Sequence, residues 1–254
     1  MTMNDSCKLN FALNHIAHLE DYINEDSNPS LIEPLNTIRE ELEKQENLLQ
    51  SNLQWRTLPL FAKPLASTFI HEGACSKLKE LASKAKWFPS APVELCGSKI
   101  GEISDNKYIL NDDEELKEYI KSCCLNGLKV LGYDTDIQIT TSWFTLTKNN
   151  GMSNPHCHSN SWFSSVIYFD DYDEGSSPLN FSVLHNSISV EPTEHNSFTG
   201  RSYNVQPQTG MFLLFPSDTI HQVTYGENKK ERFSLALNIM PKGVQGQSDS
   251  TFNY

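Results

Sequence analysis

Residues 210–239 read GMFLLFPSDTIHQVTYGENKKERFSLALNI and contain two strand-like segments separated by a polar stretch. In the second segment, RFSLALNI, apolar and polar residues alternate, which is the pattern of a strand with two different faces. One face carries Phe233, Leu235, Leu237 and Ile239, and the other carries Arg232, Ser234, Ala236 and Asn238. An interior face that holds an arginine and a serine needs a bound anion, and a guanidinium group offers a two-pronged fit to a carboxylate.

Strand-like segments are found before and within this region, and helical patterns precede them all. IQITTSWFTLTK at 137–148, SSVIYFDD at 164–171 and MFLLFPS at 211–217 are short, rich in β-branched or aromatic residues, and bounded by turn-forming residues. Helical spacing is found over 73–87 and 112–132. This order predicts an α+β chain with a double-stranded β-helix, a jelly-roll or cupin-like barrel, whose core spans about residues 137–240 of a domain over 56–254.

The N-terminal region has a different pattern. Residues 8–24 and 31–49 have apolar residues at helical spacing, and a capping box formed by Ser30 and Glu33 starts the second segment. We therefore expect a helical hairpin over residues 1–55. It would pack on the rest of the chain or pair with a second copy in a homodimer.

Composition limits the classes of function. The 254 residues carry 20 Lys+Arg against 32 Asp+Glu, a net charge of -12, which makes nucleic-acid binding unlikely to be the function of the chain. No apolar run is long enough for a membrane span, and no secretory signal is visible, so we expect a cytoplasmic protein without membrane contact. Six cysteines without a CxxC pair predict reduced thiols, and packing is the expected role of Cys157.

Histidines form the strongest candidate site. In NPHCHSNSW, at 154–162, His156 and His158 alternate, so both would lie on one side of an extended chain. His221 follows 63 residues after His158, at the end of the apolar segment. Converging neutral imidazoles suit iron, zinc, copper or nickel. Tyr168 would face the same cavity if the strand after His158 is continuous, and a bulge at SNSW is the alternative.

Together these motifs resemble the Fe(II)/2-oxoglutarate-dependent dioxygenases, and in particular a bacterial and phage branch with an H-x-H motif that is similar to prolyl hydroxylases. The resemblance covers about residues 137–240. It implies two cofactors, Fe(II) and 2-oxoglutarate, with His156 and His221 as iron ligands. It also implies that Arg232, Ser234 and Tyr168 bind the far carboxylate of 2-oxoglutarate. The implied reaction uses O2 and hydroxylates an unactivated C–H bond of a small molecule, amino acid or peptide.

One position departs from the usual pattern of two histidines and one carboxylate, because His158 stands in the place of the carboxylate. His158 would be a third ligand, which is the interpretation that we favour. Alternatively, it lies behind the metal and leaves a position open for water or halide, as in halogenating relatives. In the third alternative the barrel has lost its chemistry.

Substrate binding is less well defined by the sequence. Asn160, Trp162 and Asn238 flank the expected cavity and are candidate substrate-binding residues, with capping of the barrel mouth as the alternative for Trp162. Two other functions remain open at this point. One is a cofactor-free three-histidine metal cupin dioxygenase, and the other is a non-catalytic binding barrel.

Overall fold

The computed structural model describes residues 12–17, 19, 32–51, 58, 60, 62–93, 99–183, 192, 193, 196 and 198–254. Two compact units are present, Met1–Leu60 and Phe61–Tyr254. In the first unit, residues 12–17 are helical and helix α2 spans Ile32–Ser51. Much of the predicted helix 8–24 lies outside the described residues, so the hairpin and its pairing in a homodimer stay predictions.

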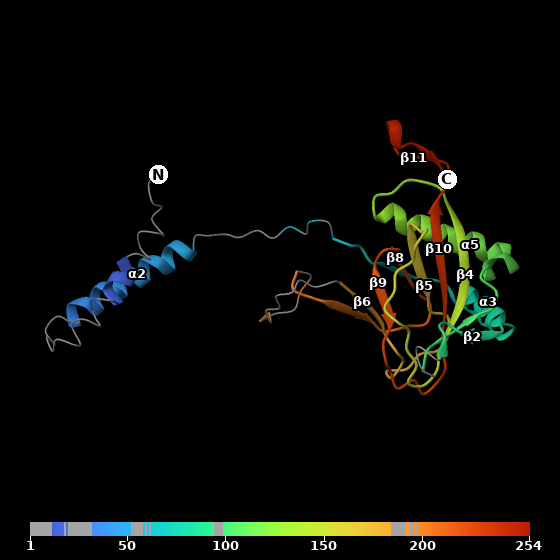
Figure 1. Cartoon of the computed structure of the whole chain (residues 1–254), viewed down its shortest axis with the longest axis horizontal. Coiled ribbons are helices and arrows are strands. Elements are labelled where there is room, and N and C mark those ends of the chain that lie inside the picture. Colours follow the sequence, from blue (N-terminus) through green and yellow to red (C-terminus); the bar gives the residue numbers. More distant parts are fainter. Residues whose placement is uncertain are drawn as a thin grey trace. The chain divides into compact units, whose positions relative to one another are not determined.

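The second unit is built on a seven-stranded sheet of antiparallel pairs, in the order β1-β8-β5-β10-β4-β3-β2 (Figure 1). Its strands are β1 Ala66–Phe69, β2 Trp87–Pro89, β3 Glu102–Ser104, β4 Ile137–Thr147, β5 Phe163–Ile167, β8 Met211–Pro216 and β10 Arg232–Pro241. The strands that the alternation predicts correspond to β4, β5, β8 and β10, which are the centre of this sheet. β10 lies between β4 and β5, so Ser234 pairs with Thr145, and Asn238 pairs with both Thr141 and Ser164.

A second sheet has three strands in the order β7-β6-β9, with β6 at Leu179–Ser182, β7 at Ser202–Val205 and β9 at Ile220–Val223. The expectation that His221 ends the apolar strand is wrong. β8 ends at Pro216, the amide of Thr219 donates to the carbonyl of Pro216 in a turn, and His221 lies on β9 in the second sheet. A proline followed by Ser, Asp and Thr favours this turn over a continued strand.

Two helices cover the outer face of the large sheet. α3 spans Glu72–Ser83 and α5 spans Glu114–Val130, and the side chains of His71 and Asp113 cap their N-termini. The buried side of each helix packs against the sheet in one core, which contains Leu78, Leu116, Ile120, Cys124, Leu128, Phe144, Ile167 and Leu235. The short elements are η2 Ile109–Asp112, β11 Val244–Gln245, η3 Ser248–Ser250 and β12 Phe252–Asn253.

A smaller core joins the inner faces of the two sheets. It consists of Val166, Tyr168, Leu179, Phe181, Leu213 and Phe215. Two facing antiparallel sheets around such a core, with helices on the outside, are the expected α+β double-stranded β-helix, and this prediction is confirmed.

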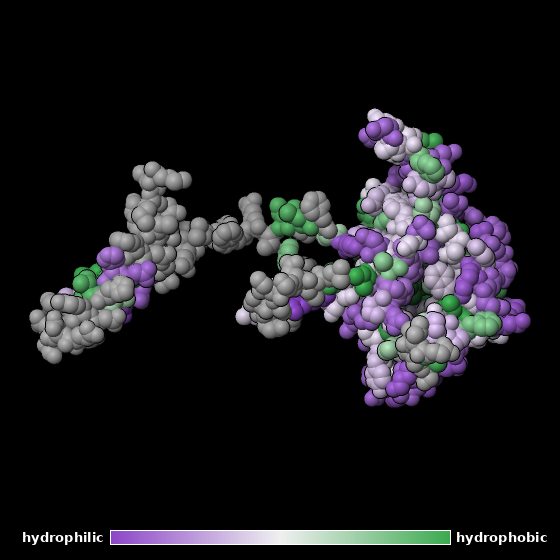
Figure 2. Space-filling model, viewed as in Figure 1, coloured by the Kyte–Doolittle hydropathy of each residue, from purple (hydrophilic) through white to green (hydrophobic). Residues whose placement is uncertain are grey.

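The visible surface of the second unit is mainly hydrophilic, with small hydrophobic patches (Figure 2). None of the described helices has the length and apolar character needed to cross a membrane. Of the cysteines in the described ranges, Cys75 and Cys124 are buried and Cys123 is half-buried, whereas Cys157 is exposed. The expected packing role of Cys157 is therefore wrong, because the segment between the two histidines runs along the surface.

Candidate metal centre

His156, His158 and His221 lie together, with one ligand atom of each within 4.8 Å of the others. Backbone hydrogen bonds bring the two segments side by side. The amides of His156 and His221 each donate to the other residue's carbonyl, at 3.0 and 2.9 Å, and the amide of His158 donates to the carbonyl of Ser217. His156 is exposed, His158 is half-buried and His221 is buried, so the cluster extends inward from the surface.

The Nδ1 atom of each histidine faces an oxygen acceptor. His156 Nδ1 is 2.8 Å from the carbonyl of Asn154, and His221 Nδ1 is 2.9 Å from the carbonyl of Thr219. His158 Nδ1 is 2.6 Å from the side-chain oxygen Oδ1 of Asn238. A carbonyl oxygen only accepts, so Nδ1 of each ring carries the hydrogen and Nε2 keeps the lone pair. All three histidines thus present the atom that a metal ion requires.

Burial keeps two of these rings neutral. Desolvation lowers the pKa of His158 below its ordinary value, and it lowers the pKa of His221 to about 4. Near neutral pH both imidazoles are therefore uncharged, as metal binding requires.

Arg232, at the start of β10, is 1% exposed and has few partners. Its Nη2 donates to the hydroxyl of Tyr168 at 3.1 Å, and its guanidinium carbon lies 5.0 Å from the centre of that ring. Among the described residues, Nε and Nη1 have no hydrogen-bond partner. Burying a charged group without partners is costly, so this arrangement fits a bound carboxylate.

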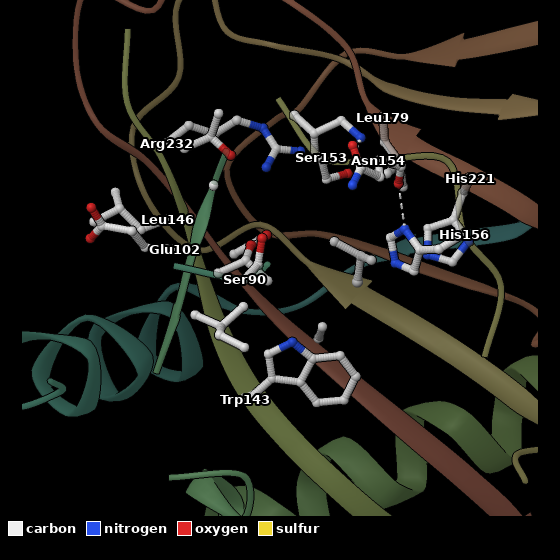
Figure 3. A pocket seen from close by; sticks show the side chains of 18 of the residues that line it. Ser90, Glu102, Trp143, Leu146, Ser153, Asn154, His156, Leu179, His221 and Arg232 are labelled. Atoms are coloured by element: carbon white, nitrogen blue, oxygen red, sulfur yellow. Dashed lines mark hydrogen bonds between the residues drawn. The ribbon is translucent and has the colours of Figure 1, made fainter. Parts of the chain in front are cut away.

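Arg232 and the histidines line one cavity of about 300 Å³. In Figure 3 the guanidinium of Arg232 points across this cavity, from the side opposite His156 and His221, and Trp143 lies on a third side. Ser234 also lines the cavity, and its hydroxyl is 2.6 Å from that of Thr145 on the neighbouring strand. Apolar side chains form much of the remaining wall: Ile100, Ile103, Leu146, Val166, Leu179, Phe215, Val223 and Ala236.

Tyr168 is fully buried just after β5 and contacts Arg232 rather than the cavity itself. Burial raises the pKa of its hydroxyl, so the group stays protonated. Because this hydroxyl accepts from Arg232, its own hydrogen remains available to an anion bound beside the guanidinium.

The candidate substrate-binding residues lie elsewhere. Asn160 and Trp162 line a separate hollow with Ser161, Met240, Pro241 and Tyr254. Asn160 has a φ of 55°, so the chain turns there and the alternation between His158 and β5 is broken. The indole of Trp162 packs edge-on against Tyr133 and Phe163. Asn238 contacts His158 and is not among the residues that line the main cavity.

Some of the cavity residues were not predicted from the sequence. Trp143 and Thr145 lie on one face of β4, and the alternation of IQITTSWFTLTK places both side chains on the face that lines the cavity. Glu102 lies on the three-residue strand β3 and pairs with Lys148 at 2.7 Å. A strand of this length has too few residues for a recognisable period, so no sequence signal points to Glu102.

Comparison with known proteins assigns this geometry to a family. Residues 141–238 match a family model described as "Putative 2OG-Fe(II) oxygenase", where 2OG is 2-oxoglutarate. The match includes all three histidines and Arg232. The matched segment, which is less than half of the chain, is similar to 2OG-Fe(II) oxygenases. For this segment the predicted family, enzyme class and cofactor pair, Fe(II) and 2-oxoglutarate, are thereby confirmed.

Solved structures share the fold of the oxygenase domain at low sequence identity. The alpha-ketoglutarate-dependent epimerase SnoN from nogalamycin biosynthesis has a TM-score of 0.54 and 9% identity, and the alignment covers 73% of this chain and 79% of SnoN. AviO1 from Streptomyces viridochromogenes has a TM-score of 0.50 and 13% identity, with 73% and 93% of the two chains covered. Among curated proteins, the chain has no significant match.

Proposed function

We propose that His156, His158 and His221 hold Fe(II) through their Nε2 atoms, and that Arg232 binds the far carboxylate of 2-oxoglutarate. The substrate would be a small molecule, an amino acid or a peptide, with hydroxylation of an unactivated C–H bond as the reaction. The observation that carries this proposal is the buried guanidinium of Arg232, whose Nε and Nη1 have no partner among the described residues and which faces the histidine cluster across one cavity.

Each side chain has a distinct task in this proposal. Three imidazole ligands would bind the metal without neutralising its charge, so the site would attract the dianionic oxo acid more strongly than a site with a carboxylate ligand would. Arg232 and Tyr168 bind the distal carboxylate of the oxo acid. Ser234, held by Thr145, adds a hydroxyl on the same wall. Fe(II) and 2-oxoglutarate, when bound, would supply the oxidising chemistry together with O2, which would give one oxygen atom to the oxo acid as it loses CO2 to become succinate and the other to the substrate.

The cavity also limits the substrate. Its volume of about 300 Å³ is at the lower end of the range of ligand pockets, so beside the oxo acid it holds only the reacting end of a larger substrate. The apolar wall and Trp143 exclude water from this end.

The first test is an anaerobic titration of the metal-free protein with Fe(II) and 2-oxoglutarate, followed by visible absorption. We expect a weak metal-to-ligand charge-transfer band for the wild type and for Cys157→Ser, a matched control between two ligands. We expect His158→Ala to lose the band. Failure of the wild type to bind 2-oxoglutarate contradicts the proposal, and bound metal without the oxo acid favours a cofactor-free cupin. A band that survives at a shifted position in His158→Ala removes His158 from the ligand set.

A further inference from the structure

The hydrogen-bond partner of His158 Nδ1 differs in kind from the partners of the other two histidines. His156 and His221 donate to backbone carbonyls, which can only accept a hydrogen bond. His158 instead faces the side-chain amide of Asn238, and an amide presents an acceptor or a donor according to which end faces the ring. The protonation of the metal-facing nitrogen of His158 therefore depends on which end of the Asn238 amide faces the ring, and the hydroxyl of Ser164 is a second neighbour of Nδ1.

Strand register places two hydroxyl groups beside this amide. Asn238 lies on β10, directly opposite Thr141 on β4 and Ser164 on β5. Its Nδ2 donates to the hydroxyl of Thr141 at 3.1 Å, and the hydroxyl of Ser164 donates to its Oδ1 at 2.9 Å. With the nitrogen directed at Thr141, the oxygen is left to face His158.

A buried chain of hydroxyls extends this support. Ser164 Oγ lies 2.9 Å from His158 Nδ1 and 2.8 Å from the hydroxyl of Ser217. Ser217 donates to Ser161, which donates to the carbonyl of Phe163. The side chains of Ser164 and Ser217 are almost fully buried. In this dry interior, a rearrangement that leaves one of these polar groups without a partner is costly.

We propose that Asn238 is a positioning residue that keeps His158 in the tautomer with Nδ1 protonated, and that this pairing enables a histidine to replace the usual carboxylate ligand. The inference rests on the proposed function, because it takes His158 as a ligand. A carboxylate at position 158 would present lone pairs in any orientation and would need no such partner. His158 and Asn238 thus act as a pair, and Asn238 acts through His158 rather than on the substrate.

Titration with Co(II) alone tests this pairing, with affinity measured by visible absorption in competition with a chelator. We expect Asn238→Leu to weaken Co(II) binding by about 10–100-fold, the range for outer partners of metal-binding histidines. Asn238→Asp, which keeps an acceptor facing the ring, restores the affinity. Thr141→Val weakens binding because the amide loses the acceptor for its Nδ2. In a His158→Asp background, Asn238→Leu leaves the affinity unchanged.

The tautomer itself is measured in the metal-free protein by nitrogen NMR of labelled histidines, with His158→Gln identifying the signal. We expect His158 to be protonated on Nδ1 in the wild type and in Asn238→Asp, and to shift toward Nε2 protonation in Thr141→Val and Asn238→Leu. Should Asn238→Leu fail to fold, the other two variants decide the outcome.

Two results overturn the inference. One is an unchanged His158 tautomer in Thr141→Val and Asn238→Leu, and the other is an equal loss of Co(II) affinity from Asn238→Leu in both backgrounds. Failure of the proposed function gives a different result, in which the wild type binds no Co(II) or His158→Ala leaves the affinity unchanged. The NMR measurement still tests the tautomer in that case.

Discussion

The two ends of the cavity differ in how many of their polar atoms have hydrogen-bond partners. At the histidine end, every Nδ1 has an oxygen partner, and burial keeps His158 and His221 in the neutral form. At the opposite end, Arg232 is buried with two nitrogen atoms that lack partners among the described residues. In terms of the proposed function, the comparison teaches that the hydrogen bonds of the histidine end are formed in advance, whereas the arginine end is left for a ligand to complete.

Loss of a histidine is the change with the largest expected effect on this comparison. His221→Ala removes the most buried ligand, and we expect Co(II) binding to fall below detection in an equilibrium titration, because two imidazoles hold the ion only weakly. Cys157→Ser, between the other two ligands, serves as the matched control and should bind as the wild type does. Wild-type affinity in His221→Ala would show that the metal lies elsewhere.

Arg232→Met distinguishes the two ends most sharply, since its two expected effects have opposite signs. Binding of 2-oxoglutarate should fall by roughly 2–5 kcal/mol, the cost of removing one partner of a buried charge pair. Without ligand, the variant should gain about 1–3 kcal/mol of unfolding free energy, because an unsatisfied buried charge is removed. Isothermal calorimetry and urea unfolding measure the two effects. The exposed Lys229→Met is the control, and lower stability of ligand-free Arg232→Met would mean that the guanidinium has partners.

Stability of the metal-free protein should depend on pH through the histidine end. The pKa of His221 is about 4 in the folded chain and about 6.5 when unfolded, so the unfolded state binds more protons between these values. Unfolding free energy should therefore rise with pH across this window and lose on the order of 3 kcal/mol as pH falls from 6.5 to 4. Denaturant unfolding with a chelator present measures this slope. His221→Gln should flatten it, and an equal slope in the variant would assign the effect to other groups.

The smallest expected effect comes from removing a single tyrosine hydroxyl beside Arg232. Tyr168→Phe removes the hydroxyl beside Arg232 and should weaken 2-oxoglutarate binding by about 1 kcal/mol, or several-fold. Tyr172→Phe is the control, since that hydroxyl donates to the carbonyl of Phe233. It should lower stability without changing binding of the oxo acid. Equal affinities in the two variants would argue against a direct contact with Tyr168.

The sequence predicts the centre of the fold better than its edges. β4 and β10 have ten or more residues with clear alternation, so their partners and inward faces follow from the pattern. β2, β3, β6, β7 and β9 have only three or four residues each, too few to show a period, and tertiary pairing determines them.

The same limit applies to the site. His156, His158, His221, Arg232 and Ser234 come together as their motifs predict. Asn160 and Trp162 do not join them, because the chain turns at Asn160 and both residues line a separate hollow. The contact of Asn238 with His158 depends on the register of three strands, which single-strand patterns do not encode.

The decrease in solvent exposure from His156 through His158 to His221 also has a kinetic consequence. His221 is 4% exposed and His158 is half-buried, whereas His156 stands in solvent. In the proposed site, an entering ion would meet His156 first and a leaving ion would meet it last, so we expect exchange to proceed stepwise from the surface inward. We therefore expect the exposed His156 to set how quickly the proposed site is loaded and emptied.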